Sequence, residues 1–304
     1  MKREAQIKKI LTENGLDFTI VKRPLLSYDD GGNELLTPYY GLYNSETLEC
    51  INTCKEGYTV SQNSDVVDMV LQGIEPFSKT LEVTKAGSLN GGRRVYLQLA
   101  ILGDDKIGKG DSIRKYVTII DSNDGTTGLS VGIGDLTMSC QNQFFRFYKA
   151  GNARFRHTAT LAQKIKTIPE LINVALKESM RQIEIYRKFE STPLTKRMAH
   201  ELVQAVLGYD RELTSTEKQA SLTSRSIGIM DSLYSNIETE IEDKGNNLWA
   251  LHSGVTRWTT HEKRGPKREN GHVESMLVGA GYKKNIASFN FALGKVGMAQ
   301  VELV

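Results

Sequence analysis

The chain has 304 residues, of which 39% are hydrophobic and 25% charged, with 27 Gly, 6 Pro and 3 Cys. This composition is typical of a soluble globular protein and excludes a disordered, a collagen-like and a disulfide-stabilised chain. The 39 Lys and Arg nearly balance the 36 Asp and Glu, so the net charge of +3 gives no argument about partners for the protein as a whole.

The cysteines and the N-terminus indicate a cytoplasmic protein. Cys50, Cys54 and Cys140 are odd in number and form no Cys-x-x-Cys motif, which favours a reducing compartment. Residues 1–11 contain four Lys or Arg and lack the apolar core of a signal peptide. No stretch approaches the ~20 apolar residues of a membrane span, so we expect no membrane partner.

In the first half, β-branched and aromatic residues alternate with polar ones, which predicts strands separated by turns. Short strands are expected at residues 37–43, 48–53 and 58–60. Residues 64–74 have the spacing of an amphipathic helix, and Asn63 is placed to cap it.

Three more strands and a helix are predicted next. Apolar side chains alternate along residues 93–102, which predicts a half-buried strand. Residues 115–121 and 126–133 follow as strands, joined by a turn at 122–125 because Asp-Gly tolerates positive φ. Aromatic residues then recur at helical spacing, which predicts a helix over 135–150 that Asp135 caps.

After residue 157 the pattern becomes helical nearly everywhere. Amphipathic helices are expected at 168–186, 192–208, 215–243 and 248–258, and the Gly- and Pro-containing run after 262 is expected to be a loop. We therefore predict an α+β fold. An antiparallel strand meander backed by a helix forms a β-rich core over residues 1–157, and residues 158–304 form a mostly helical region packed on this core as one continuous unit.

No motif indicates a catalytic residue, a metal or a cofactor. Residues 103–110 nearly match a phosphate-binding P-loop, but Gly110 replaces the Ser or Thr that binds magnesium, and strands flank the run on both sides. Residues 121–125 lack the glycine and glutamate positions of a calcium loop, which favours a tight turn. The five histidines show no metalloenzyme spacing.

Cations and aromatic residues are interleaved at residues 144–149 and 154–157. Between residues 79 and 166 there are 14 Lys and Arg against 7 Asp and Glu, a local net charge of +7. Cations that neutralise phosphates, together with aromatic faces that stack on bases, are typical of single-strand binding. The alternative for Phe144 and Phe147 is that both belong to the hydrophobic core.

We predict that nine basic residues form a single cationic track that binds nucleic acid. They are Arg93, Arg94, Arg114, Lys115, Arg146, Lys149, Arg154, Arg156 and His157. For each residue at a strand end, a solvated position beside a turn is the alternative. A second basic group lies in the loop after residue 262 and contacts either a second strand or nothing; it comprises Lys263, Arg264, Lys267 and Arg268.

Several segments together resemble domain-of-unknown-function family 932, which phages and plasmids carry. These segments are Tyr40-Gly41-Leu42-Tyr43, residues 58–63, Ser122-Asn123-Asp124-Gly125, Cys140-Gln141-Asn142, Arg156-His157-Thr158 and the run from Leu248-Trp249 to His261. They span most of residues 37–262. That family often carries His before Asp-Gly in the turn, where this chain has Asn123.

The family is similar in element order to the single-strand annealing superfamily typified by Redβ and RecT. This similarity, which is an analogy of fold, implies a recombination protein that needs no nucleotide, is no enzyme, and assembles into a ring or a filament. It also implies a phage exonuclease or a host single-strand-binding protein as further partners.

Single-stranded DNA binding and annealing for phage or plasmid recombination is therefore the expected function. Two alternatives stay open. One is a magnesium-dependent enzyme acting on nucleotides or nucleic acid, with Asp104, Asp105 and Asp111 near the glycine-rich run. The other is a structural or assembly protein of a phage.

Overall fold

The computed structural model describes residues 2–108, 111–126, 128–139, 141–147, 154–155, 167–208, 223–262, 267 and 270–301. The strands are β1 (Ile20–Tyr28), β2 (Glu34–Asn44), β3 (Cys50–Lys55), β4 (Leu81–Leu89), β5 (Arg94–Ile107), β6 (Asp111–Ser122), β7 (Leu129–Thr137), β8 (Gln143–Phe147) and β9 (Arg154–Phe155). The helices are α1 (Lys2–Glu13), α2 (Asn63–Ile74), α4 (Ile168–Glu190), α5 (Lys196–Leu207), α7 (Ser224–Lys244), α8 (Leu248–Arg257), α9 (Gly271–Leu277) and α10 (Ala280–Lys295), with a 3₁₀ turn η1 (Glu75–Phe77) and a π-helical turn η3 (Trp258–Glu262).

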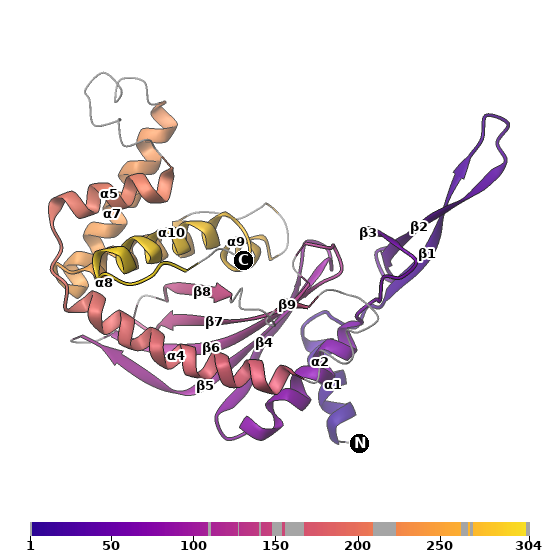
Figure 1. The fold of residues 1–304 in the computed structure, drawn as a ribbon, viewed down its shortest axis with the longest axis horizontal. Helices are drawn as coiled ribbons and strands as arrows, with labels where there is room; N and C mark the ends of the chain where they lie inside the picture. Colours follow the sequence, from indigo (N-terminus) through magenta and orange to yellow (C-terminus); the bar gives the residue numbers. More distant parts are fainter. Residues whose placement is uncertain are drawn as a thin grey trace.

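The strands form two antiparallel sheets. The smaller sheet has the order β1-β2-β3, and the larger has the order β4-β5-β6-β7-β8, with β9 paired to the end of β7 (Figure 1). Short turns join β1 to β2, β2 to β3 and β4 to β5, which is what antiparallel pairing allows. Gly125, at φ +75°, lies in the turn between β6 and β7, as Asp-Gly predicts. The predicted α+β class, with its antiparallel meander and mostly helical C-terminal half, is confirmed.

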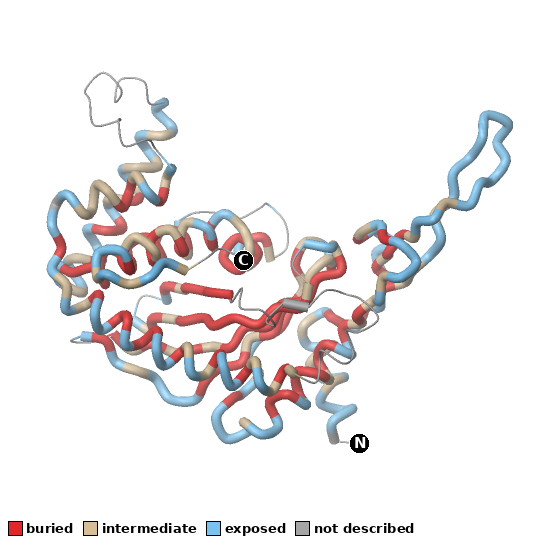
Figure 2. Tube along the Cα trace, viewed as in Figure 1, coloured by how far each residue is buried: buried red, intermediate tan, exposed pale blue. Residues whose placement is uncertain are grey.

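One face of the larger sheet packs against α2 and α4. The alternating residues of β5 supply this face, and Leu97 and Leu99 are fully buried in a core that includes Ile168 and Ile172 of α4. Figure 2 shows the strands of this sheet as mostly buried. Strand β5 is more buried than its alternation predicts, because the opposite face of the sheet is also covered. Tyr96, on that opposite face, is only 1% exposed.

On the opposite face, aromatic rings lie flat across glycines of the neighbouring strand. Tyr96 of β5 crosses Gly87 of β4, and Phe145 of β8 crosses Gly134 of β7. A Cβ atom on Gly134 would lie 2.5 Å from Cδ1 of the Phe145 ring, so only glycine allows this approach. The rings and glycines together give this face a shallow surface, which α9 partly covers through contacts with β4 and β8.

The C-terminal helices share a core with the edge of the larger sheet. The rings of Tyr186, Trp249, His252 and Phe289 meet there, with Tyr186 and Trp249 centred 4.5 Å apart. Phe144 of β8 packs against these rings. This confirms the alternative prediction that Phe144 belongs to the hydrophobic core. No helix within the described ranges is long and apolar enough to cross a membrane.

Two predicted elements are wrong. Residues 58–60 form no strand: they pair with no neighbouring strand, and the Tyr58 backbone oxygen accepts a hydrogen bond from the Lys22 ammonium instead. The helix predicted over 135–150 is instead the end of β7, a turn and strand β8, while residues 148–150 lie outside the described residues. The aromatic residues of β8 are buried on both sides of the sheet, and such a continuous apolar run does not reveal its period.

Asp135, the predicted helix cap, is instead buried in β7. Its Oδ2 accepts hydrogen bonds from the Tyr186 hydroxyl at 2.7 Å and from the Gln182 amide, both on α4. Burial raises the pKa of Asp135 from 3.8 to about 6, although these hydrogen bonds and the nearby charge of Arg146 oppose the rise. The carboxyl group therefore binds its proton more tightly in the folded than in the unfolded chain.

This pKa difference predicts how stability depends on pH. Between pH 3.8 and about 6 the folded chain holds a proton on Asp135 that the unfolded chain has lost, so the contribution of Asp135 is present at low pH and declines as pH rises. The decline is on the order of 3 kcal/mol. We expect Asp135→Asn to abolish it, measured as the difference between wild-type and variant urea unfolding free energies across this range. An unchanged difference would show that Asp135 does not titrate there.

Candidate nucleic-acid interface

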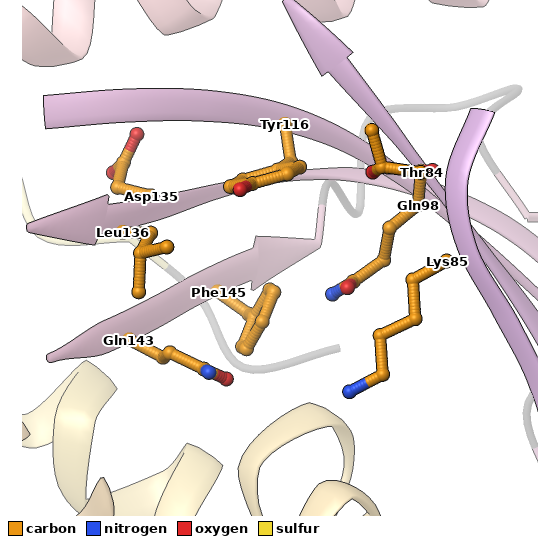
Figure 3. Close-up of a pocket in the computed structure, with 8 residues that line it drawn as sticks. All are labelled: Thr84, Lys85, Gln98, Tyr116, Asp135, Leu136, Gln143 and Phe145. Carbon is orange, nitrogen blue, oxygen red and sulfur yellow. Dashed lines mark hydrogen bonds between the residues drawn. The ribbon is translucent and has the colours of Figure 1, made fainter. Parts of the chain in front are cut away.

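A pocket of about 220 Å³ opens on the aromatic face of the larger sheet. Its lining comes from β4 to β8 and comprises Thr84, Lys85, Gln98, Tyr116, Asp135, Leu136, Gln143 and Phe145. Figure 3 shows the polar ends of Lys85, Gln98 and Gln143 around the ring of Phe145, whereas the carboxylate of Asp135 points to the other side of the sheet. The pocket therefore presents one ammonium group, two amides and aromatic surface.

Lys85, which lines the pocket, interacts electrostatically with a histidine of α9. The pKa of His272 on α9 is lowered mainly by partial burial. The charges of His261 and Lys85 lower this pKa further. These three groups are therefore close enough to interact electrostatically. His261, on η3, is held through Nε2, which lies 3.2 Å from Oδ1 of Asn142. An anion bound beside Lys85 would oppose this lowering and favour protonation of His272.

The size and charge of the pocket limit what it can bind. Ligand pockets for whole cofactors are typically ~300–1,000 Å³, so about 220 Å³ suits one flat ring rather than a dinucleotide. A second cavity, of about 470 Å³, lies between the β5–β6 end of the sheet and α7. Its charged lining is mainly acidic, with Asp111, Glu190 and Asp243 beside Lys244, and a polyanion is disfavoured there.

The first pair of predicted contact residues lies at the β4–β5 turn. Arg94 is largely buried, and its guanidinium contacts Asp124 at 2.8 Å and Glu274 of α9 at 3.5 Å. Arg93 is half-buried and donates a hydrogen bond from Nη2 to the backbone oxygen of Cys50 at 3.0 Å. Arg94 thus joins the sheet to α9 and offers no free cation.

Arg114, Lys115 and Arg146 of the predicted set are paired with carboxylates, as Arg94 is. Arg114 is partly exposed and its Nε contacts Asp104 at 3.1 Å, while Lys115 is buried against Asp105. Arg146 is buried on the α4 side of the sheet, where its Nη2 lies 3.5 Å from Glu178 and its guanidinium lies over the ring of Phe289. These pairs neutralise the cations that sequence reasoning assigned to phosphates.

The described residues do not form the single cationic track that the sequence predicts. Arg94 lies opposite Ser122 of β6, and Ser122 is eight residues from Arg114 on the same strand. Eight residues of a strand span about 27 Å, so Arg94 and Arg114 are far apart. Lys115 and Arg146 lie on the opposite face from both. Of Arg154 the structure describes only the backbone, paired with Ser130. Three predicted residues lie outside the described residues: Lys149, Arg156 and His157.

The pocket residues themselves were missed by sequence reasoning. Lys85 falls in the basic region counted between residues 79 and 166, but β4 was not predicted, so nothing indicated its direction. Gln98 and Tyr116 alternate with the apolar residues of β5 and β6, which was a detectable signal. His272 follows the basic loop in the sequence, and only the packing of α9 brings it to Lys85.

The glycine-rich run does not have the geometry of a P-loop. Residues 103–107 belong to β5, and β6 begins at Asp111, so strands flank the run. Asp104 and Asp105 are the ion-pair partners of Arg114 and Lys115. Across the described part of the chain, no group of three or more His, Cys, Asp or Glu side chains is arranged to hold a metal ion.

Comparison with known families matches most of the chain. The model of the family described as Domain of unknown function (DUF932) matches residues 51–283, which is more than half of the sequence. The chain belongs to the DUF932 family. No curated protein and no solved structure matches it.

One group of segments that resemble DUF932 lies where the smaller sheet meets the larger one. Asn123 in the β6–β7 turn accepts a hydrogen bond from the Tyr58 hydroxyl at 3.2 Å and donates one to the Ser61 backbone oxygen at 3.1 Å. Asn63 donates to the backbone oxygens of Leu16 and Phe18. Asn123 thus joins the β6–β7 turn to the segment that follows β3 in this DUF932 chain.

A second group lies where β8 meets the C-terminal helices. Asn142 donates from Nδ2 to Oε1 of Glu240 at 3.1 Å and contacts His261. Trp249 donates from Nε1 to Oδ2 of Asp111 at 2.7 Å. Several polar residues of the DUF932 segments therefore connect the sheet to α7, α8 and η3, and so fix where His261 lies beside the pocket.

Proposed function

We propose that this protein binds single-stranded DNA and promotes annealing of complementary strands in phage or plasmid recombination, with no nucleotide cofactor. The observation that supports the proposal is the pocket on the aromatic face of the larger sheet, where Lys85, amide groups and aromatic rings converge. The similarity in element order to single-strand annealing proteins, which the sequence predicts, is the second argument for the proposal.

Each part of the pocket has a role in this proposal. Lys85 neutralises a backbone phosphate, and a base lies against the rings of Phe145 and Tyr116, since every base has a π-face and such stacking tolerates any sequence. The amides of Gln98 and Gln143 each offer donors and an acceptor to a sugar or a base edge. Pairing with the complementary strand supplies the specificity.

The basic loop extends the same binding path in this proposal. It leaves η3 at Glu262 and returns at Asn270, whose Nδ2 donates to the Ser88 backbone oxygen of β4 at 3.0 Å. The Asn270 end is therefore anchored to β4, the strand that carries Lys85, whereas Glu262 is held by Ser232 and Asn236 of α7. Lys267 is exposed; Lys263, Arg264 and Arg268 lie outside the described residues. Lys267 is therefore the described cation that this segment offers to a phosphate.

Assembly and location are further parts of the proposal. A ring or filament of identical chains would place many modest binding sites along one strand, which raises the overall affinity without any new contact. We also propose a cytoplasmic location, and a phage exonuclease or a host single-strand-binding protein as partners, on the resemblance alone.

Lys85→Glu tests the binding site. We expect this exchange to weaken binding of a fluorescent oligothymidylate at least about tenfold and to reduce the slope of log affinity against log salt by about 0.7, the loss of one phosphate contact. Lys8→Glu, an equal charge change at an exposed position on α1, is the matched control. Fluorescence anisotropy at several salt concentrations gives both quantities. Equal binding by the two variants would exclude this pocket, and salt-independent binding would exclude the phosphate mechanism.

A further inference from the structure

The outer parts of β1 and β2 form a two-stranded arm that projects from the rest of the chain (Figure 1). β3 pairs with β2 only from Tyr39 to Tyr43, so the arm, residues 24–38, has no third strand. The tip is a formed turn, in which Oδ1 of Asp29 accepts hydrogen bonds from the backbone amides of Gly31 and Asn33, both at 2.9 Å. The arm is therefore an ordered ribbon rather than an irregular loop.

The arm exposes apolar side chains that nothing in the described chain covers. Leu26 is paired with Leu36 across the ribbon, and Tyr28 follows two residues along on the same face. Leu36 is 83% exposed and Tyr28 64% exposed, and Figure 2 shows the whole arm as exposed. An isolated two-stranded ribbon is at best marginally stable in water, so this face requires a partner to cover it.

The charge of the arm identifies the kind of partner. Residues 24–38 contain three carboxylates, Asp29, Asp30 and Glu34, and no Lys or Arg. This charge repels nucleic acid, so the arm is unsuited to the strand that the pocket is proposed to bind. A complementary surface must combine apolar side chains with cations.

The outer face of α4 has this combination. Val174 and Met180 are among the few large apolar side chains exposed on the body of the protein, with Met180 66% exposed. Lys177, Arg181 and Lys188 are exposed at helical spacing on the same face. Arg187 adds a fourth cation. Between Val174 and Lys188 the acidic residues are Glu178, which is paired with Arg146 and Arg181, and Glu184, which is paired with Arg187.

We propose that the arm of one chain docks on the outer face of α4 of a second copy. Leu26, Tyr28 and Leu36 cover Val174 and Met180, and the carboxylates of the tip meet the cations of α4. The arm and α4 are different surfaces, so the contact is head-to-tail and leads to a ring or a filament. The inference rests on the assembly included in the proposed function, but both surfaces lie outside the DNA pocket, and the arm also lies outside the matched family region.

Charge reversal tests this contact without DNA. We expect Asp30→Lys with Glu34→Lys, and separately Lys177→Glu with Lys188→Glu, each to reduce the assembly to the 33.9 kDa of a single chain. The chain that carries all four exchanges should assemble again, because both signs are reversed. Sedimentation velocity measures the mass. Asp29 is left unchanged because it holds the turn of the tip.

Matched controls carry the same charge changes at other exposed positions, Glu238→Lys with Glu242→Lys on α7 and Lys8→Glu with Lys9→Glu on α1, and both should assemble normally. Carbodiimide treatment of mixed isotope-labelled and unlabelled chains should join Glu34 of one copy to Lys177 of another. A wild-type chain that remains monomeric, a defect in the arm variant alone, or crosslinks between two arms would overturn the proposal. Oligothymidylate binding by the monomeric variants, compared with Lys85→Glu, tests the DNA pocket separately.

Discussion

Replacement of Lys244 by Met is expected to lower the free energy of unfolding by about 3–5 kcal/mol, because it removes the cation from a buried cluster of charges. The Lys244 ammonium lies 3.1 Å from Oδ2 of Asp111 and 2.8 Å from Oε2 of Glu240, and all three side chains are less than a tenth exposed. Arg257 contacts Glu240 at 3.3 Å and remains in the variant. Asp111 is then the carboxylate that loses its buried cation.

Urea unfolding followed by tryptophan fluorescence measures this loss, since Trp249 donates its indole N–H to Asp111. The matched control is Asp243→Ala, which removes a third contact of Lys244, at 3.5 Å, from a carboxylate that is 63% exposed. Exposed ion pairs contribute ~1 kcal/mol or less, so the control should unfold nearly as the wild type does. Similar losses in the two variants would mean that burial of the cluster does not determine its energy.

Replacement of Gly254 by Val is expected to destabilise the protein by roughly 3 kcal/mol through overpacking. Gly254 lies in α8 where this helix crosses α7, and an added Cβ would lie 2.5 Å from the Cα and 2.7 Å from the Cγ1 of Ile237. The obstructing atoms include backbone of α7, so a rotamer change cannot relieve the clash and the two helices must move apart. Gly254→Ala should also destabilise the protein, although alanine has a higher helix propensity than glycine.

The control for this close approach is Gly228→Ala in α7, where a Cβ atom would meet nothing within 4 Å. Because alanine favours helix over glycine by ~1 kcal/mol, this exchange should stabilise the protein. Thermal and urea unfolding of the two alanine variants therefore give opposite signs. If Gly254→Ala also stabilised the protein, the close packing of α7 against α8 would be refuted.

Local patterns in the sequence predict much of the secondary structure. The helical periodicity after residue 168 agrees with α4, and Gly208, at φ +73°, ends α5 as predicted. Thr195 rather than Thr192 caps α5, and its hydroxyl accepts a hydrogen bond from the Met198 amide. These features depend on interactions within a few residues, so one sequence contains the information. Strands β1 and β4 were missed because Pro24, Gly87 and exposed side chains interrupt their alternation.

The positions of charged groups in space could not be predicted in the same way. Arg94 and Arg146 each look like available cations in the sequence, yet Glu274 and Glu178, from distant helices, are the partners that neutralise them. Conversely, Lys85 and His272 are far apart in the chain and come together only because α9 packs across β4 and β8. Electrostatic interactions act over a few ångströms in space, whatever the separation along the chain.

The sequence alone therefore determined the class of fold, most of the helices, the turn at Asn123-Asp124-Gly125 and the family to which the chain belongs, because composition, periodicity and turn chemistry are local properties. The tertiary structure decided which cations are paired, which aromatic face forms a pocket, and that the arm of residues 24–38 stands uncovered. Such features depend on contacts between residues that are distant in sequence, and these contacts are fixed only when helices and sheets pack around a common core.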